Sequence, residues 1–564
     1  MKKAITLFSF LCFLDLVTAQ AQTPLPFNTL EHVDINNISA GLLVHGDMWW
    51  NPVTLNADCS FPATSVKNIS FAGSLWMSGY DTSGNLHLSA QTYRQNGNDY
   101  WPGPLDSSDT LTYASSQKWA KIWKINRTDI QHFQGLVTHD SASTLNAIWT
   151  WPAKGNIHAA GLFGAPIDIT TDMAPFVDLN GNGIYEPLLG EYPDIKGDQA
   201  LWWVFSDNGS AHSETNAKPL YVEIHGMAFA YRRGTLIDNV IYYDYNIINK
   251  SPNTYTNFRI AQWADMDLGY YLDDYIGFDS IHRMGFNYNG TNDDGLTGGL
   301  PPNSYAAHMP IAGVTMIVMP RDSISRIVPA GSFTYYNNDT THQIGNPTID
   351  TQYNNYMRSK LKNGQHFTKD FAGSGVPSNG YGTGPNTNYV FDGKIGDTSE
   401  WTECNCNDTL GDRRFIIASN DFTFHAGEMQ HIVMALVTTN LDTNNGCSAL
   451  VNFDSIYTVA DTAWATYFNP LPPLPSQIQK VETNETISIY PNPAHNYIYI
   501  IDKNKNLSEH MYCVYNTIGQ KMNVESSQSL NTVEIRIDNL PNGIYYLLYN
   551  NGIEHKNTGF IKNN

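Results

Sequence analysis

Short runs in which hydrophobic and polar residues alternate recur between about residues 216 and 468. Residues 236–249 (LIDNVIYYDYNIIN), 258–267 (FRIAQWADMD) and 414–424 (RFIIASNDFTF) repeat with a period of two, which is typical of strands that bury one face. Residues 429–439 (MQHIVMALVTT) are almost continuously apolar, which predicts a strand buried on both faces. With frequent Gly, Pro and Asn between the runs, the pattern predicts a mainly β fold.

One stretch follows the helical period of 3.6 instead. Residues 448–468 predict an amphipathic helix, whose apolar stripe is formed by Leu450, Phe453, Tyr457, Ala460, Ala463, Trp464 and Tyr467. Residues 469–486 then contain four prolines close together, which predicts a semi-rigid linker. The chain is therefore expected to end in a domain of its own, after this linker.

The N-terminus has the three parts of a secretory signal peptide. Lys2 and Lys3 give a positive start, residues 4–17 are mostly apolar, and Ala19-Gln20-Ala21 fits a cleavage site. We expect five segments: a signal peptide (1–21), an aromatic-rich β and loop region with a candidate calcium loop (22–215), a β-rich region ending in the helix (216–468), the linker (469–486) and a C-terminal domain (487–564). Residues 22–468 are expected to form β-sandwich domains with loop-rich insertions and few helices.

The charge balance restricts the partners. The formal net charge is −21, and loss of two lysines and one aspartate with the signal peptide changes it to −22. An acidic chain without a basic patch is not expected to bind nucleic acid, whereas it attracts divalent cations. No later stretch is long and apolar enough to predict a transmembrane segment.

Residues 487–564 consist of short alternating runs bounded by Pro, Asn or Gly, which predicts a small antiparallel β-sandwich of the immunoglobulin-like kind. They resemble the type A C-terminal sorting domain of the type IX secretion system of Bacteroidetes. The resemblance is carried, in the order found in that family, by Tyr490-Pro491-Asn492-Pro493, Tyr515-Asn516-x-x-Gly519-Gln520, Leu540-Pro541-x-Gly543-Ile544-Tyr545 and Phe560-Ile561-Lys562.

That resemblance implies a destination and not an activity. It implies passage across the outer membrane by the type IX machinery, followed by cleavage by a surface sortase and attachment to lipopolysaccharide. The protein is then extracellular or attached to the cell surface. The preceding region resembles other proteins with this tail, and that resemblance carries no known activity. The matching segments are 177–187 (VDLNGNGIYEP), 190–207 (GEYPDIKGDQALWWVFSD) and 262–279 (QWADMDLGYYLDDYIGFD).

The segment DLNGNGIYEP (178–187) predicts a calcium loop. Alternate oxygen ligands followed by a glycine turn match the first nine positions of such a loop, although the acidic residue at position twelve is replaced by Leu189. Glu191, Asp194 or Asp198 can supply the missing carboxylate, and a solvated Asx-turn loop without a cation is the alternative. The candidate ligands are Asp178, Asn180, Asn182, the Ile184 carbonyl, Glu186, Asp194 and Asp198.

A second acidic segment, DMDLGYYLDDYIGFD, is a weaker candidate for calcium. Like charges this close repel unless a cation or an arginine neutralises them. A period of two places Asp265 and Asp267 on one face of the strand. Exposed carboxylates and a catalytic acid–base pair are the alternatives. The candidate ligands are Asp265, Asp267, Asp273, Asp274 and Asp279.

Other patterns point away from recognised chemistry. The spacing His425-x-x-Glu428-x-x-His431 matches no zinc protease motif and lies between strand-like runs, so strand, turn and strand is the favoured interpretation. Cys404 and Cys406 are too close to pair with each other, and the partner of each stays open between Cys59 and Cys447.

The adjacent tryptophans at 49–50 and 202–203 are expected mainly in the core, with stacking on sugar rings as the alternative. We interpret the protein as a secreted, calcium-stabilised binding or adhesion protein with a glycan or matrix ligand. The alternatives are a secreted hydrolase of polysaccharide or peptide and a structural protein of a surface layer. A hydrolase is expected to show a deep cleft with convergent titratable groups, and a binding protein a shallow aromatic patch.

Overall fold

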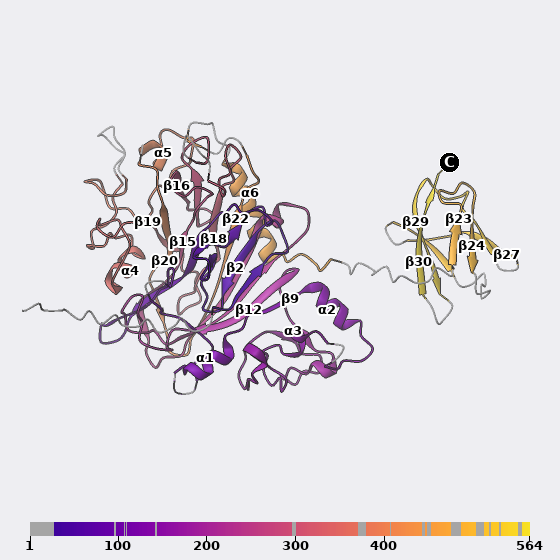
Figure 1. Cartoon of the computed structure of the whole chain (residues 1–564), viewed down its shortest axis with the longest axis horizontal. Coiled ribbons are helices and arrows are strands. Elements are labelled where there is room, and N and C mark those ends of the chain that lie inside the picture. The colour runs from indigo at the N-terminus through magenta and orange to yellow at the C-terminus, as the bar shows by residue number, and fades with distance from the viewer. Residues whose placement is uncertain are drawn as a thin grey trace, which may run out of the picture. The chain divides into compact units, whose positions relative to one another are not determined.

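The computed structural model divides the chain into two compact units, one that ends at Leu474 and one that begins at Pro475 (Figure 1). The residues that the structure describes are 28–94, 97–106, 108, 110–141, 144–295, 301–369, 379–406, 408–442, 446–447, 453–474, 487–502, 512–517, 520–529, 532–550 and 555–563.

A large sheet runs through the first unit, and every pairing within it is antiparallel. Eight of its nine strands lie in the spatial order β16 (Asp274–Asp279), β17 (Met284–Asn289), β18 (Ala312–Val318), β22 (Met429–Thr438), β14 (Val240–Asn249), β13 (Val222–Ala230), β12 (Gln199–Ser206) and β8 (Trp101–Pro102). The ninth strand, β9 (Trp123–Asn126), also pairs with β12.

A second sheet of six strands holds the residues of the cleft described below. Five of its strands lie in the spatial order β19 (Ala330–Asn337), β20 (Arg413–Ser419), β15 (Tyr255–Asp265), β6 (Ala72–Tyr80) and β7 (Leu86–Ser89). The sixth strand, β21 (Phe422–Phe424), also pairs with β15. Smaller sheets are formed by β1 (Leu30–Val33), β2 (Ser39–Leu43) and β5 (Cys59–Ser60), by β3 (Trp50–Asn51) and β4 (Asn56–Ala57), and by β10 (Phe176–Val177) and β11 (Tyr192–Pro193).

Helices are short and few, which agrees with the predicted mainly β class. The predicted helix at 448–468 is found as α6 (Asp454–Phe468), while residues 448–452, and with them Leu450, lie outside the described residues. The others are α1 (Tyr113–Trp119), α2 (Arg127–Gln134), α3 (Asn146–Trp149), α4 (Asp350–Tyr356) and α5 (Glu403–Cys406), with single 3₁₀ turns η1 (Leu162–Gly164), η2 (Pro187–Leu189) and η3 (Leu236–Asn239).

The nine-stranded sheet is buried on both faces. One hydrophobic cluster joins it to the six-stranded sheet, and a second cluster on its other face includes side chains of α2 and α6. This arrangement explains the apolar run of β22, and it also buries almost all of β14, whose alternating sequence predicted one exposed face. Trp202 and Trp203 point into different clusters, and both are at most 2% exposed.

Strands from both regions of the first unit share its sheets. β12, which precedes residue 215, pairs with β13, which follows it, and β6 pairs in the same way with β15. The two regions named from the sequence, 22–215 and 216–468, therefore contribute to one compact unit. A disulfide also joins Cys404 to Cys447, while Cys59 and Cys406 are buried thiols outside this disulfide.

The C-terminal unit contains two four-stranded antiparallel sheets. One follows the order β23 (Ile487–Tyr490), β24 (Tyr497–Asp502), β28 (Thr532–Arg536) and β27 (Glu525–Ser529). The other follows the order β26 (Lys521–Met522), β25 (Tyr512–Asn516), β29 (Gly543–Asn550) and β30 (His555–Lys562). Side chains of both sheets share one small hydrophobic core, as the predicted sandwich requires.

Candidate cation site in an open cleft

The floor of a cleft is built where β15 and β20 pair. Asp265 is the last residue of β15, and its register partner on β20 is Arg414. Asp267 follows the end of β15 by two residues, and Asp412 directly precedes β20. Because antiparallel pairing places the end of one strand beside the start of the other, these four side chains meet from distant parts of the sequence.

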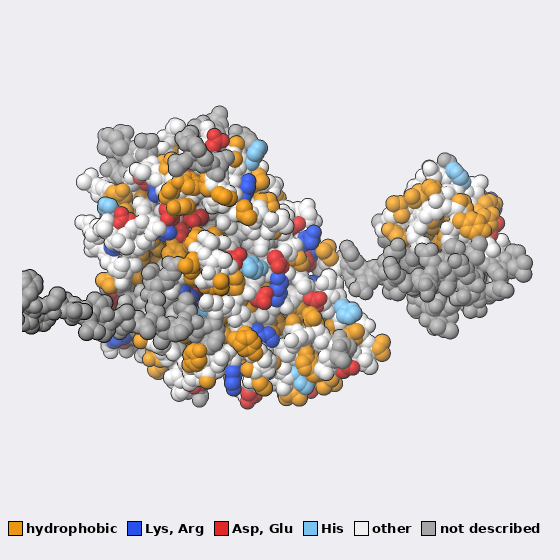
Figure 2. All heavy atoms as spheres, in the orientation of Figure 1, with side chains coloured by type: hydrophobic (Ala, Val, Ile, Leu, Met, Phe, Trp, Pro, Cys, Tyr) orange, Lys and Arg blue, Asp and Glu red, His pale blue; other side chains and the backbone are white. Residues whose placement is uncertain are grey.

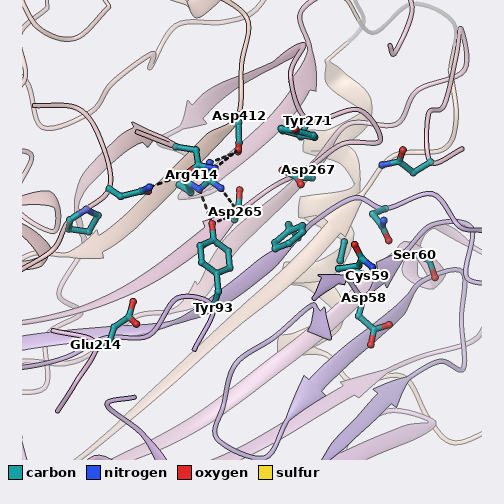
Figure 3. Close-up of a pocket in the computed structure, with 18 of the residues that line it drawn as sticks. Asp58, Cys59, Ser60, Tyr93, Glu214, Asp265, Asp267, Tyr271, Asp412 and Arg414 are labelled. Carbon is teal, nitrogen blue, oxygen red and sulfur yellow. Dashed lines mark hydrogen bonds and ion pairs between the residues drawn. The ribbon is translucent and has the colours of Figure 1, made fainter. Parts of the chain in front are cut away.

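Asp265, Asp267 and Asp412 form a group of carboxylates that we call the Asp triad (Figure 3). One oxygen from each residue lies within 4.8 Å of those of the other two. Asp265 is buried, and Asp267 and Asp412 are half-buried. Two oxygens that each lie about 2.4 Å from one Ca²⁺ are separated by at most about 4.8 Å, so the triad is compact enough to share one ion.

Arg414 neutralises only part of this charge. Its Nη2 lies 3.0 Å from Oδ2 of Asp265, its Nη1 contacts Asp412, and its Nε donates to the Tyr93 hydroxyl over 2.8 Å. That hydroxyl donates in turn to Oδ2 of Asp265. The second oxygen of Asp265 is buried without a hydrogen-bond partner, and Asp267 makes no hydrogen bond to any residue that the structure describes.

The electrostatics of the triad favour either a cation or a bound proton. Burial raises the pKa of Asp265, against the opposing effect of Arg414. Burial also raises the pKa of Asp267 well above its usual value, and the neighbouring Asp265 and Asp412 raise it further. Three carboxylates beside one guanidinium repel one another, and a divalent cation at their common point would remove that repulsion.

The triad lies in an open cleft of about 1390 Å³. Asparagine, serine and threonine supply much of its lining, among them Asn56, Ser60, Asn68, Ser213, Asn303 and Thr348. Glu214 is a further buried acid of this cleft, where Tyr353 donates to its Oε1 over 3.0 Å while its Oε2 has no partner. Burial raises the pKa of Glu214 to about 7.

The structure separates the five carboxylates of the second predicted site. Asp265 and Asp267 belong to the triad, together with Asp412, which the sequence analysis missed. Asp273 and Asp274 instead accept hydrogen bonds from the backbone amides of Gly295 and Leu268, over 2.7 and 3.0 Å. Asp279, at the far end of β16, contacts the imidazole of His282.

The first predicted site forms a compact exposed loop. Asp178 accepts the backbone amides of Gly181 and Gly183, each over 2.7 Å, and both glycines have a positive φ that suits the turn. Asn180 and Asn182 donate to one oxygen of Glu186, over 2.9 and 2.6 Å. In this arrangement the side-chain oxygens of Asp178 accept amides of the loop itself, and hydrogen bonding to those amides lowers the pKa of Asp178.

The other residues proposed for that loop differ in their surroundings. The Ile184 amide donates to Oδ1 of Asn182 over 2.7 Å, which closes the turn. Glu191 accepts the backbone amides of Leu179 and Glu186, so this buried acid braces the loop from below. Asp194 is exposed, and Asp198 contacts the guanidinium of Arg233.

The His425, Glu428 and His431 side chains do not converge. His425 and Glu428 belong to the turn between β21 and β22, where Glu428 accepts the His425 amide over 2.7 Å. His431 lies within β22 and contacts Asp244 on the neighbouring strand over 2.8 Å. The strand, turn and strand interpretation of this segment is confirmed.

In the C-terminal unit, the Tyr490-Pro491-Asn492-Pro493 segment begins at the last residue of β23 and contacts β30. The side chain of Asn492 accepts the Ile561 amide over 2.9 Å and donates to the Gly559 carbonyl over 3.2 Å. Tyr545 donates to the carbonyl of Pro541 over 2.8 Å, which closes the turn that leads into β29. The motif residues Leu540, Gly543 and Lys562 lie in or beside this sheet, and Gly519 is outside the described residues.

Residues 488–563 match the family described as "Secretion system C-terminal sorting domain". The C-terminal unit is a type IX sorting domain. This confirms the resemblance of the sequence motifs, and it places the protein among the cargo that crosses the outer membrane to the cell surface or the medium. The sorting domain implies engagement with the type IX machinery. Among helices of the described residues, none has the length and hydrophobicity needed to span a membrane.

Comparisons beyond the sorting domain are weak. The search of curated proteins gave no match. Among solved structures, a polysaccharide lyase is similar over 60% of this chain and 34% of its own, with 8% identity and a TM-score of 0.18. A putative aldose 1-epimerase from Escherichia coli K12 is similar over 52% of this chain and 83% of its own, with 9% identity and a TM-score of 0.18. The chain thus spans about a third of the length of the lyase, and likenesses this low support no inference about function.

Proposed function

We propose that the region exported by the sorting domain is a carbohydrate-binding protein of the cell surface, and that its cleft depends on a bound Ca²⁺. The observation that carries this proposal is the Asp triad, which gathers three carboxylates beside one guanidinium at the cleft floor. The buried oxygen of Asp265 that has no protein partner also supports the proposal, because buried polar atoms are nearly always hydrogen-bonded to protein or ordered water or bound to an ion.

Calcium fits these donors better than other common metals. Every candidate ligand is an oxygen, whereas structural zinc sites use thiolate and imidazole. Magnesium keeps several of its waters and takes one or two carboxylates, and a group of three suits the higher coordination number of Ca²⁺. Calcium is also the interpretation we retain for the 178–186 loop, as a second and structural site braced by Glu191.

The lining of the cleft supports a hydroxyl-rich ligand. Neutral amides and hydroxyls both donate and accept, which suits the alternating hydroxyls of a sugar. Tyr271 also lines the cleft with 40% of its surface exposed, and it can stack on the apolar face of a sugar ring. The adjacent tryptophans do not supply this contact, because Trp49, Trp50, Trp202 and Trp203 are all buried. Figure 2 shows few charged side chains among many uncharged ones on the visible face of this unit.

The test is the substitution Asp267→Asn, which removes one carboxylate without changing the size of the side chain. The wild-type protein, stripped with a chelator, is expected to bind Ca²⁺ in calorimetry and to bind glycans on an array only when Ca²⁺ is present. A ligand at a hundred times its Kd stabilises the folded state by about 2.7 kcal/mol, which a thermal melt resolves. Asp267→Asn is expected to lose the cleft-dependent part of both responses.

Asp293→Asn, at an exposed aspartate that does not line the cleft, is the matched control and should behave as wild type. A melt alone does not separate the triad from the 178–186 loop, so the variant comparison is decisive. Equal Ca²⁺ titrations for wild type and Asp267→Asn would mean that the triad holds no calcium.

A second candidate function is acid–base hydrolysis of a glycan. It is favoured by the raised pKa of Asp267 and of Glu214 in an open cleft, since a carboxyl that stays protonated at neutral pH can donate to a leaving group. This function predicts release of reducing ends from a polysaccharide, and it predicts that Asp267→Asn abolishes turnover while the chelator has no effect.

A further inference from the structure

A second polar cavity lies beside the cleft, and the two share one wall. The wall is the segment 337–348, which begins at the last residue of β19. The cleft is lined by Asn338, Thr340, Asn346, Pro347 and Thr348 of this segment. The neighbouring cavity, of about 980 Å³, is lined by Asn337, Asp339, His342, Gln343 and Ile344.

The shared wall is tied to the Asp triad. Asn338 donates to Oδ2 of Asp412 over 3.2 Å, and Asn346 donates to Oδ1 of Asn338 over 2.9 Å. On the other side, the hydroxyl of Tyr356 on α4 donates to the Gly345 carbonyl over 2.6 Å. These hydrogen bonds fix segment 337–348, which we call the ridge, and polar groups line both of its sides. Through the Asn338–Asp412 contact, its position depends on a carboxylate that would hold the cation.

Among the described residues that line the two cavities, no lysine or arginine is left without an acidic partner, and the other basic side chains are His342, which contacts Asp339, and His366. Five carboxylates and one guanidinium line the cleft, and each nitrogen of Arg414 already contacts Asp265, Asp412 or Tyr93. The described lining of the second cavity contains no lysine or arginine. A uronate or sulfate group would meet a negative potential, which one divalent ion at the triad would reduce without reversing it.

Each cavity presents one exposed tyrosine. Tyr271 in the cleft is 40% exposed, and Tyr381 in the second cavity is 47% exposed. An aromatic ring with a free face stacks on the C–H face of a sugar while its hydroxyl stays hydrated. The ridge thus separates two cavities, each lined by one partly exposed tyrosine that can stack on a sugar.

We infer that the ligand is an uncharged, extended polysaccharide that crosses the ridge and stacks on Tyr271 on one side and on Tyr381 on the other. This inference rests on the proposed function. The size of the site supports it, because the cleft alone exceeds the range of about 300–1,000 Å³ usual for small-molecule sites, and the second cavity adds to it. A chain of several sugar units fills such a site, and a monosaccharide does not.

The experiment uses the full mature chain with Ca²⁺ present. An array of neutral and acidic polysaccharides identifies the glycan bound, and oligomers of that glycan, from the disaccharide upward, are then titrated by calorimetry. Affinity is expected to rise with length and to favour neutral over acidic glycans. Tyr381→Ala is expected to weaken binding of long oligomers about tenfold and to leave the shortest unchanged, whereas Tyr271→Ala weakens every length. Tyr113→Ala, at an exposed tyrosine that lines neither cavity, is the matched control.

The outcomes separate this inference from the proposed function. If a glycan binds in a Ca²⁺-dependent way but its affinity does not change with length, or Tyr381→Ala has no effect on long oligomers, the extended site is wrong and the proposed function stands. Preference for acidic glycans would likewise overturn the uncharged class alone. If no glycan binds at all, the proposed function and this inference are both wrong.

Discussion

Asp265 and Arg414 are register partners on β15 and β20, with Nη2 of Arg414 3.0 Å from Oδ2 of Asp265 at the floor of the cleft. Both side chains are at most 5% exposed. Arg414 also contacts Asp412 and Tyr93, so a single guanidinium binds two carboxylates and a phenol hydroxyl. The relationship makes Arg414 the residue on which the electrostatic balance of the triad depends.

Replacing Arg414 by leucine is expected to destabilise the first unit by about 3–5 kcal/mol in the presence of a chelator. The loss arises because buried carboxylates remain without their partner. If the triad binds a cation, added Ca²⁺ should recover part of this loss, since the ion then supplies the missing positive charge. Chemical denaturation with and without Ca²⁺ measures both effects. A loss that is the same in both conditions would show that no cation enters the triad of the variant.

Glu214 gives a prediction about pH. Burial raises its pKa from an ordinary value of 4.5 to about 7, so the folded protein binds more protons than the unfolded chain between these values. Its contribution to stability is therefore most favourable below pH 4.5 and is lost as the pH rises to 7. Glu214→Gln removes this penalty, and we expect it to stabilise the protein at pH 8 by up to about 3 kcal/mol.

The difference between Glu214→Gln and wild type should shrink as the pH falls and vanish near pH 4. Urea denaturation across this range provides the measurement. Glu31→Gln, at a half-buried glutamate outside the cleft, serves as the control for removing a carboxylate elsewhere. A constant difference at all pH values would mean that Glu214 stays ionised in the folded protein.

The sequence predicts the local features of this protein better than its site. Alternation identified β14, β15 and β20, and motif order identified the sorting domain, because both signals depend on residues close together in the chain. The same period of two placed Asp265 and Asp267 on one side. It could not supply Asp412, Arg414 or Tyr93, since Arg414 and Tyr93 are 321 positions apart and only the register of the strands brings them together.

The sequence predicted burial on both faces for β22 but not for β14. The alternating pattern of β14 predicts one exposed face, yet Tyr242 and Tyr243 are both buried. The polar atom of Tyr242 is satisfied by the Ala463 carbonyl of α6, and that of Tyr243 by the Trp49 indole N–H. Because tyrosine has an apolar ring and a polar hydroxyl, its sequence context alone does not predict whether it is buried or exposed. The hydrogen-bond partners that make burial possible here lie on distant segments of the chain.

The 178–186 loop is expected to respond to calcium separately from the cleft. Asp178 accepts hydrogen bonds from two backbone amides of the loop. If its carboxylate binds Ca²⁺ as well, the protection of those amides against hydrogen exchange should change. Hydrogen exchange of residues 178–190 is expected to slow when Ca²⁺ is added to the wild type and to stay fast in Asp178→Asn. Asp267→Asn is the control, because it should keep the response of the loop. If the exchange rates are identical with Ca²⁺ and with a chelator, the loop binds no calcium and is an Asx-turn loop without a cation.

The final prediction concerns the bond between Cys404 and Cys447, which closes a loop of 43 residues. A loop of this length implies a loss of about 4 kcal/mol when the bond is removed, in the chain-entropy account of disulfides. Cys447→Ala is therefore expected to melt at a lower temperature than wild type and to be insensitive to a reductant, while the wild type becomes sensitive.

Cys406 lies two residues from Cys404 and is the alternative partner for Cys447, so it is the residue with which the pairing is tested. Its thiol is buried, accepts the Trp401 indole N–H over 3.1 Å, and has a pKa that burial raises to about 12, so it forms little thiolate to attack the bond. Cys406→Ala should keep both the disulfide and its response to reductant. Peptide mapping of the oxidised protein is expected to find Cys404 joined to Cys447, and a peptide joining Cys406 to Cys447 would instead mean that the other open pairing is the real one.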